Sequence, residues 1–163
     1  MPLLSVPVMN RTARILFLTA LACFVAFHFV RFTIFLDPSL SATDNTGWRI
    51  WGELPDAFRD FSRVDAEEMV IWSGFLTSSL LLASSPLLVP VLKLSRLAWW
   101  LGVLASGVAM LGFGGVIIPV LSKADYAVPG PGAYCLFAAM LLNFTGFFFI
   151  RREIPPNPVI ETA

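Results

Sequence analysis

Residues 69–92 read MVIWSGFLTSSLLLASSPLLVPVL and contain no charged side chain. An α-helix rises about 1.5 Å per residue, so about 20 residues cross the hydrocarbon core of a bilayer. The stretch is long enough to do so. Its consecutive apolar residues lack the in-and-out alternation of a transmembrane β-strand. Residues 69–92 therefore predict a membrane-spanning helix.

Three further stretches have the same character, at residues 15–36, 97–121 and 132–150. The first is longer than the apolar part of a secretory signal and contains charged residues, so we expect it to remain uncleaved. Together the four stretches predict an all-α membrane protein, with one transmembrane domain over residues 1–163 and an outer loop at residues 37–67.

The composition of the chain supports the same class. Hydrophobic residues make up 57% and charged residues 13% of the 163 residues, with a mean hydropathy of +0.78. Soluble domains are less apolar and carry about twice as much charge. Disordered chains are poor in apolar residues. Lys plus Arg and Asp plus Glu are 11 each, so no basic excess is present to bind nucleic acid. The expected surroundings are the lipid bilayer and other membrane proteins or further copies of this chain.

The charged residues divide unequally between the two sides of the predicted bundle. One side carries six basic residues and two acids: Arg11, Arg14, Lys93, Arg96, Arg151, Arg152, Glu153 and Glu161. The other side carries four basic residues and nine acids. Basic loops stay in the cytoplasm. The pattern predicts an inner-membrane protein with both termini cytoplasmic and the acidic loop outside.

The outer loop contains an amphipathic pattern. Trp51, Leu54, Phe58 and Phe61 recur at helical spacing, and charged residues fall between them. We expect a short helix on the outer membrane surface. Its apolar stripe either covers the bundle as a lid, which we favour, or docks an extracytoplasmic partner.

Small residues recur at four-residue spacing in the predicted spans. Examples are Gly74 with Ser78, Gly102 with Ser106, and Ala105 with Ala109. Such pairs let membrane helices approach closely, and we interpret them as packing faces.

Three polar residues lie within the predicted spans: His28, Arg31 and Asn143. Ionisable side chains at such depth suggest function, and His28 is a candidate ligand of a haem, a pigment or a quinone. The alternative is structural: His28 makes an interhelical hydrogen bond, with Asn143 or a serine as its partner, while Arg31 extends towards the outer surface. We favour the structural alternative.

The sequence offers no catalytic or metal-binding motif. A single histidine excludes bis-histidine haem ligation within the chain and a His-rich metal site. We therefore expect a non-catalytic accessory or scaffolding subunit of a membrane complex. The alternatives are a cofactor-binding subunit that uses His28, and a small homo-oligomeric transporter or channel.

The layout of four spans with a larger first outer loop resembles that of claudin-like tetraspan proteins. Those proteins carry a Trp…Gly-Leu-Trp…Cys…Cys signature in this loop. Here the loop contains Gly47-Trp48 and Trp51-Gly52 and no cysteine. The resemblance is one of layout and implies no shared activity.

The predicted orientation can be tested with reporter fusions. A reporter that is active only in the cytoplasm should be active when fused after residue 163 and inactive when inserted within residues 40–60, because the basic clusters resist translocation. The reverse pattern would contradict the charge argument.

Overall fold

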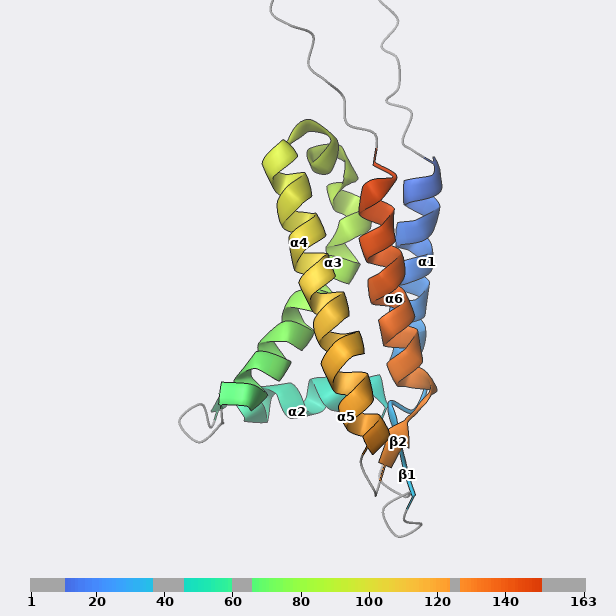
Figure 1. The fold of residues 1–163 in the computed structure, drawn as a ribbon, viewed down its shortest axis with the longest axis vertical. Helices are drawn as coiled ribbons and strands as arrows, with labels where there is room; N and C mark the ends of the chain where they lie inside the picture. The colour runs from blue at the N-terminus through green and yellow to red at the C-terminus, as the bar shows by residue number, and fades with distance from the viewer. Residues whose placement is uncertain (1–10, 37–45, 60–65, 124–126, 151–163) are drawn as a thin grey trace, which may run out of the picture.

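The computed structural model describes residues 11–36, 46–59, 66–123 and 127–150, and most of them are helical (Figure 1). The elements in chain order are α1 (Arg11–Phe27), β1 (Thr33–Phe35), α2 (Gly47–Arg59), α3 (Ala66–Leu94), α4 (Arg96–Gly112), the π-helical turn η1 (Phe113–Ile117), α5 (Ile118–Lys123), β2 (Ala127–Pro129) and α6 (Pro131–Phe148).

Three helices are long and apolar enough to cross a membrane. They comprise residues Trp72–Leu94, Arg96–Gly115 and Pro131–Phe148. Two of them begin with recognisable signals: the Ser95 hydroxyl accepts a hydrogen bond from the Ala98 N–H, and α6 has proline at its first position. These helices identify an integral membrane protein of the helical class.

The predicted helix over residues 15–36 is wrong in its last third. Helix α1 ends at Phe27, and residues 33–35 form strand β1, which pairs antiparallel with β2. The segment from Val30 to Phe35 is rich in β-branched and aromatic residues, which favour extended backbone. The pairing with β2 satisfies its backbone groups outside a helix.

Glycine at the start of α6 makes this strand pairing possible. The Gly130 N–H donates to the Phe32 carbonyl and the Gly132 N–H to the Arg31 carbonyl, both at 2.8 Å. A Cβ at Gly132 would lie 2.9 Å from the Arg31 carbonyl oxygen, closer than Cβ atoms are found. Only glycine lets the two backbones approach this closely.

Helix α1 packs along α6, and this is the most extensive contact between elements. Phe17 of α1 lies edge-to-face on Phe147 of α6, with ring centroids 5.4 Å apart, and both side chains are fully buried. Gly146 leaves the space for Phe17. Gly102 of α4 similarly leaves space for Phe147, so the same aromatic pair ties α1, α6 and α4 together.

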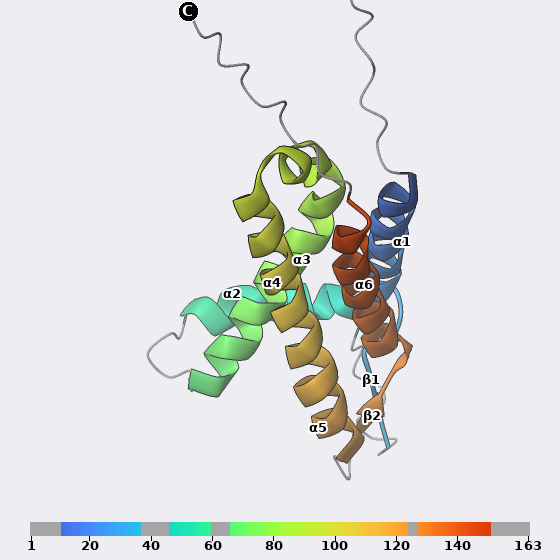
Figure 2. The ribbon, with the colours of Figure 1, turned by 45° about the horizontal axis from the view of Figure 1, so that its top comes forward.

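Helices α3 and α4 meet at Ser95 and diverge from there. Figure 1 shows the start of α3 leaning away from α4, while α2 lies across the wide end, and Figure 2 shows the same arrangement after a 45° turn. Near the far end of α4 the Ile118 N–H donates to the Phe113 carbonyl, five residues back, which forms the π-helical turn η1.

The packing at Gly146 can be tested by adding one methyl group. In Gly146→Ala the new Cβ would lie 2.8 Å from Phe17 Cε1, and the buried ring has no free space to move into. We expect the free energy of unfolding in detergent to fall by about 1–3 kcal/mol. Gly74→Ala is the control, because nothing lies within 4 Å of its Cβ. Equal stability of the two variants would contradict this account of the α1–α6 contact.

Candidate functional site

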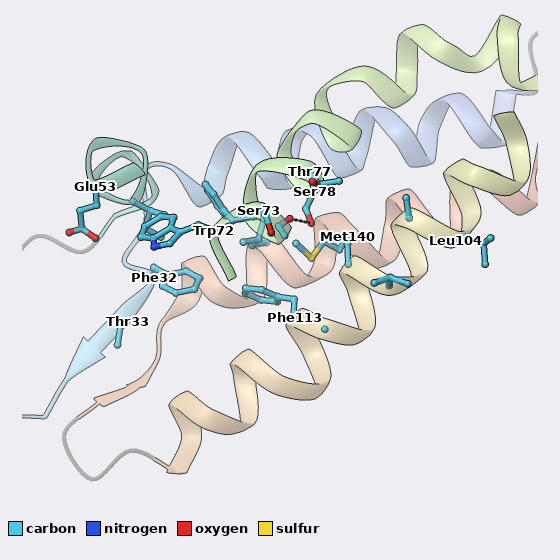
Figure 3. Close-up of a pocket in the computed structure, with 18 residues that line it drawn as sticks. Phe32, Thr33, Glu53, Trp72, Ser73, Thr77, Ser78, Leu104, Phe113 and Met140 are labelled. Carbon is cyan, nitrogen blue, oxygen red and sulfur yellow. Dashed lines mark hydrogen bonds between the residues drawn. The ribbon is translucent and has the colours of Figure 1, made fainter. Parts of the chain in front are cut away.

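A cavity of about 790 Å³ lies between the diverging halves of α3 and α4. Side chains of α3 and α4 form its two walls. Leu136 and Met140 of α6 and Ile50 and Glu53 of α2 complete the lining. Figure 3 shows Glu53 at one end of the cavity, next to Trp72. Its size falls within the range of about 300–1,000 Å³ that is usual for small-molecule sites.

Small residues on both walls account for the width of the cavity. Gly74 on α3 and Gly112 on α4 both line it, and a Cβ added to either would meet nothing within 4 Å. Ala105 and Ala109 extend the same wall along α4. The small-residue spacing in the sequence predicts helix-packing faces at Gly74, Ala105 and Ala109. In the structure Gly102 and Gly146 serve packing, whereas Gly74 and Gly112 border open space.

The lining is apolar along most of its length. Phe32, Trp72, Phe75 and Phe113 supply aromatic surface. The Ser78 hydroxyl donates to the Gly74 carbonyl of its own helix at 2.6 Å, so it is already satisfied. Glu53 is the one charged residue among the described residues that line the cavity. Its Oε1 accepts from Arg49 Nε at 3.0 Å, one helical turn earlier on α2.

A hydrogen bond between two aromatic side chains fastens α2 to the bundle. Trp51 Nε1 donates to His28 Nε2 at 2.7 Å, and Trp51 also packs on Phe75 of α3, with ring centroids 5.1 Å apart. His28 is 8% exposed and sits directly after α1. We call this contact the Trp51–His28 latch.

The latch determines the form of the imidazole. Nε2 accepts from an indole N–H that can only donate, so Nε2 carries no proton. Nδ1 lies 2.8 Å from the Phe24 carbonyl, which can only accept, so Nδ1 carries the proton. The geometry therefore requires the neutral Nδ1–H form. A haem or pigment metal could bind His28 only after one of these two hydrogen bonds is broken.

The structure separates the three polar residues that the sequence placed within the spans. Arg31 lies beyond the end of α1, is exposed, and makes a backbone bridge to Thr46. Asn143 is buried in α6, where its Nδ2 donates to the Ser106 hydroxyl of α4 at 3.3 Å. His28 bonds to Trp51 rather than to Asn143. The three residues do not form one site.

The structure describes the side chains of two of the four residues in the predicted docking stripe. Trp51 points towards His28 and Phe75, and Leu54 is half-buried. Phe61 lies outside the described residues, as does the side chain of Phe58. Trp51 therefore faces the bundle rather than away from it.

Sequence reasoning missed the cavity itself. The strongest sign of the cavity in the sequence is the pairing of small residues on two consecutive spans. Such pairing occurs both where helices pack closely and where they leave a gap. The chain matches no protein-family profile, no curated protein and no solved structure.

The latch can be tested by removing one donor. Trp51→Phe keeps the aromatic contact but leaves buried His28 Nε2 without a partner, which costs about 1–3 kcal/mol. We expect amide hydrogens of α2 to exchange at least roughly ten-fold faster, because α2 opens more often. Trp48→Phe is the control: the Trp48 ring also lies near His28, with ring centroids 4.9 Å apart, but Trp48 is 59% exposed and lies outside the latch. Unchanged exchange in Trp51→Phe would show that the latch does not hold α2.

Proposed function

We propose that this chain is a non-catalytic accessory subunit of the inner membrane that holds a small, membrane-soluble molecule in the cavity between α3 and α4. The proposal includes four membrane-crossing helices with both termini cytoplasmic, and α2 as an amphipathic lid on the outer side. Helix α1 has 17 residues, the lower end of the length that crosses a bilayer. The unequal division of charge supports the orientation.

The observation that carries the proposal is the shape of the cavity. Side chains of α3 and α4 line it where the two helices diverge, and Ile50 and Glu53 of α2 line its wide end. A membrane-spanning helix of a partner, about 30 Å long, would collide with α2 at that end. A lipid-sized molecule is short enough to fit within the cavity.

The lining supports binding rather than chemistry. Among the described residues, no group of three or more His, Cys, Asp or Glu side chains could hold a metal ion. The cavity instead offers aromatic rings, aliphatic side chains and glycine-lined space, which suit an apolar guest. Flexible Met140 of α6 can adjust to the shape of the guest.

The two other functions receive less support from the geometry. A cofactor-binding subunit that uses His28 would have to break the latch or the bond to Phe24. A homo-oligomeric transporter needs a polar pathway, and Arg31, His28 and Asn143 lie in separate surroundings. Neither the cofactor-binding subunit nor the transporter accounts for the apolar cavity between α3 and α4.

Native mass spectrometry after mild extraction from the cell's own membrane tests the proposal. We expect a bound small-molecule mass on the wild-type chain, within a larger hetero-complex. Gly112→Phe should abolish the small-molecule mass, because the new ring fills the cavity. Gly115→Phe is the matched control: it is equally open, lies three residues away and does not line the cavity.

Three results would contradict parts of the proposal. A bound mass that Gly112→Phe leaves unchanged would place the ligand elsewhere. A bound polypeptide that only Gly112→Phe displaces would make the cavity a docking site for a partner helix. A monomer or a symmetric homo-oligomer would contradict the accessory role and favour the transporter.

A further inference from the structure

We propose that the ligand of this cavity is a single-chain amphiphile whose head is uncharged or cationic and rich in hydrogen-bond donors, with its head at α2 and its chain pointing towards Leu104. The inference rests on the proposed function, since it names the chemical class of the molecule held between α3 and α4. Three features of the cavity carry it: its polarity gradient, the one charged group among its described lining residues, and its volume.

Polarity changes along the cavity. Figure 3 shows Thr33, Glu53 and Trp72 gathered at one end, from β1, α2 and the start of α3. Leu104 lies at the opposite end, further along the cavity towards the meeting point of the two helices. Ser73, Thr77 and Ser78 lie between them. A guest that matches this gradient is polar at one end only, and its polar end lies against α2.

The charge at the polar end selects the head. Glu53 presents a carboxylate there, and a carboxylate only accepts hydrogen bonds. Hydroxyl and ammonium groups donate, so they complement it. A phosphate or carboxylate head would place like charges together, which is unfavourable.

Arg49 does not reverse this preference. It pairs with Glu53 through its Nε, but it is not among the described residues that line the cavity. Glu53 is therefore the one charged group that a head between α3 and α4 meets among the described lining residues.

The dimensions of the cavity fit one chain. Space is left at Gly74 on α3 and at Gly112 on α4, because neither residue has a side chain. Leu136 and Met140 of α6 bound this space on a third side. The volume of about 790 Å³ lies within the range of sites that bury a small molecule.

Three probes with the same oleyl-length chain test the inference on the purified full-length protein in detergent at pH 8. They are monoolein with an uncharged glycerol head, oleylamine with a cationic head and oleate with an anionic head. Native mass spectrometry reports the occupancy of each as its concentration rises. We expect monoolein and oleylamine to bind at least ten-fold more tightly than oleate, and Gly112→Phe to abolish binding of both.

Glu53→Gln provides the decisive comparison, because it keeps a hydrogen-bonding side chain of the same size and removes the charge. We expect it to reduce the preference for oleylamine over oleate to less than about three-fold, while monoolein binding stays within two-fold. Asp56→Asn is the matched control, since Asp56 is an exposed carboxylate on the same helix and does not line the cavity. It should leave the ten-fold preference intact.

The possible failures can be told apart. If oleate binds as tightly as monoolein, and Gly112→Phe abolishes both, the cavity holds a ligand but the proposed class is wrong. The same conclusion follows if Glu53→Gln leaves the preference unchanged. If no probe binds in a manner sensitive to Gly112→Phe, both this inference and the proposed function are overturned.

Discussion

The close packing of α1 on α6 is the contact on which the rest of the structure depends. Phe17 fits against Gly146 at one end of this contact, and the Arg31 carbonyl meets Gly130 and Gly132 at the other. The second approach ends the helical path of α1 and directs the chain into β1. It also leaves His28 at the end of α1, where Trp51 can reach it. The position of α2 therefore follows from how α1 meets α6.

Helices α3 and α4 differ from the close-packed pair of α1 and α6, because they diverge from their shared turn. Phe147 against Gly102 and Trp99 Nε1 bonded to the Phe147 carbonyl fix the near part of α4 to α6. Beyond that region α3 leans away, and the cavity lies in the space between the two helices. The fold thus combines a close-packed half with an open half, and the candidate site belongs to the open half.

Sequence reasoning reached the class of the protein because hydropathy and length are local properties that bilayer thickness constrains directly. It misjudged residues 28–36 because an apolar run is compatible with helix or strand. The deciding partner, β2, lies about ninety residues later in the chain. The Trp51–His28 bond and the cavity were out of reach for the same reason. Each depends on where two distant helices lie, and Gly74 looks the same in a sequence whether it faces a neighbour or a void.

The π-helical turn at Phe113–Ile117 has a consequence for the far end of the α4–α5 rod. A π turn holds one residue more than an α turn, and each residue of an α-helix advances the side-chain direction by about 100°. The turn therefore rotates the side-chain directions of α5 about the helix axis, relative to those of α4. Upstream of it, α4 presents one stripe to the cavity. Downstream, α5 is rotated out of phase with that stripe, and it leads the chain back towards β1. The five residues of η1 thus allow the side chains of α4 and those of α5 to face in different directions.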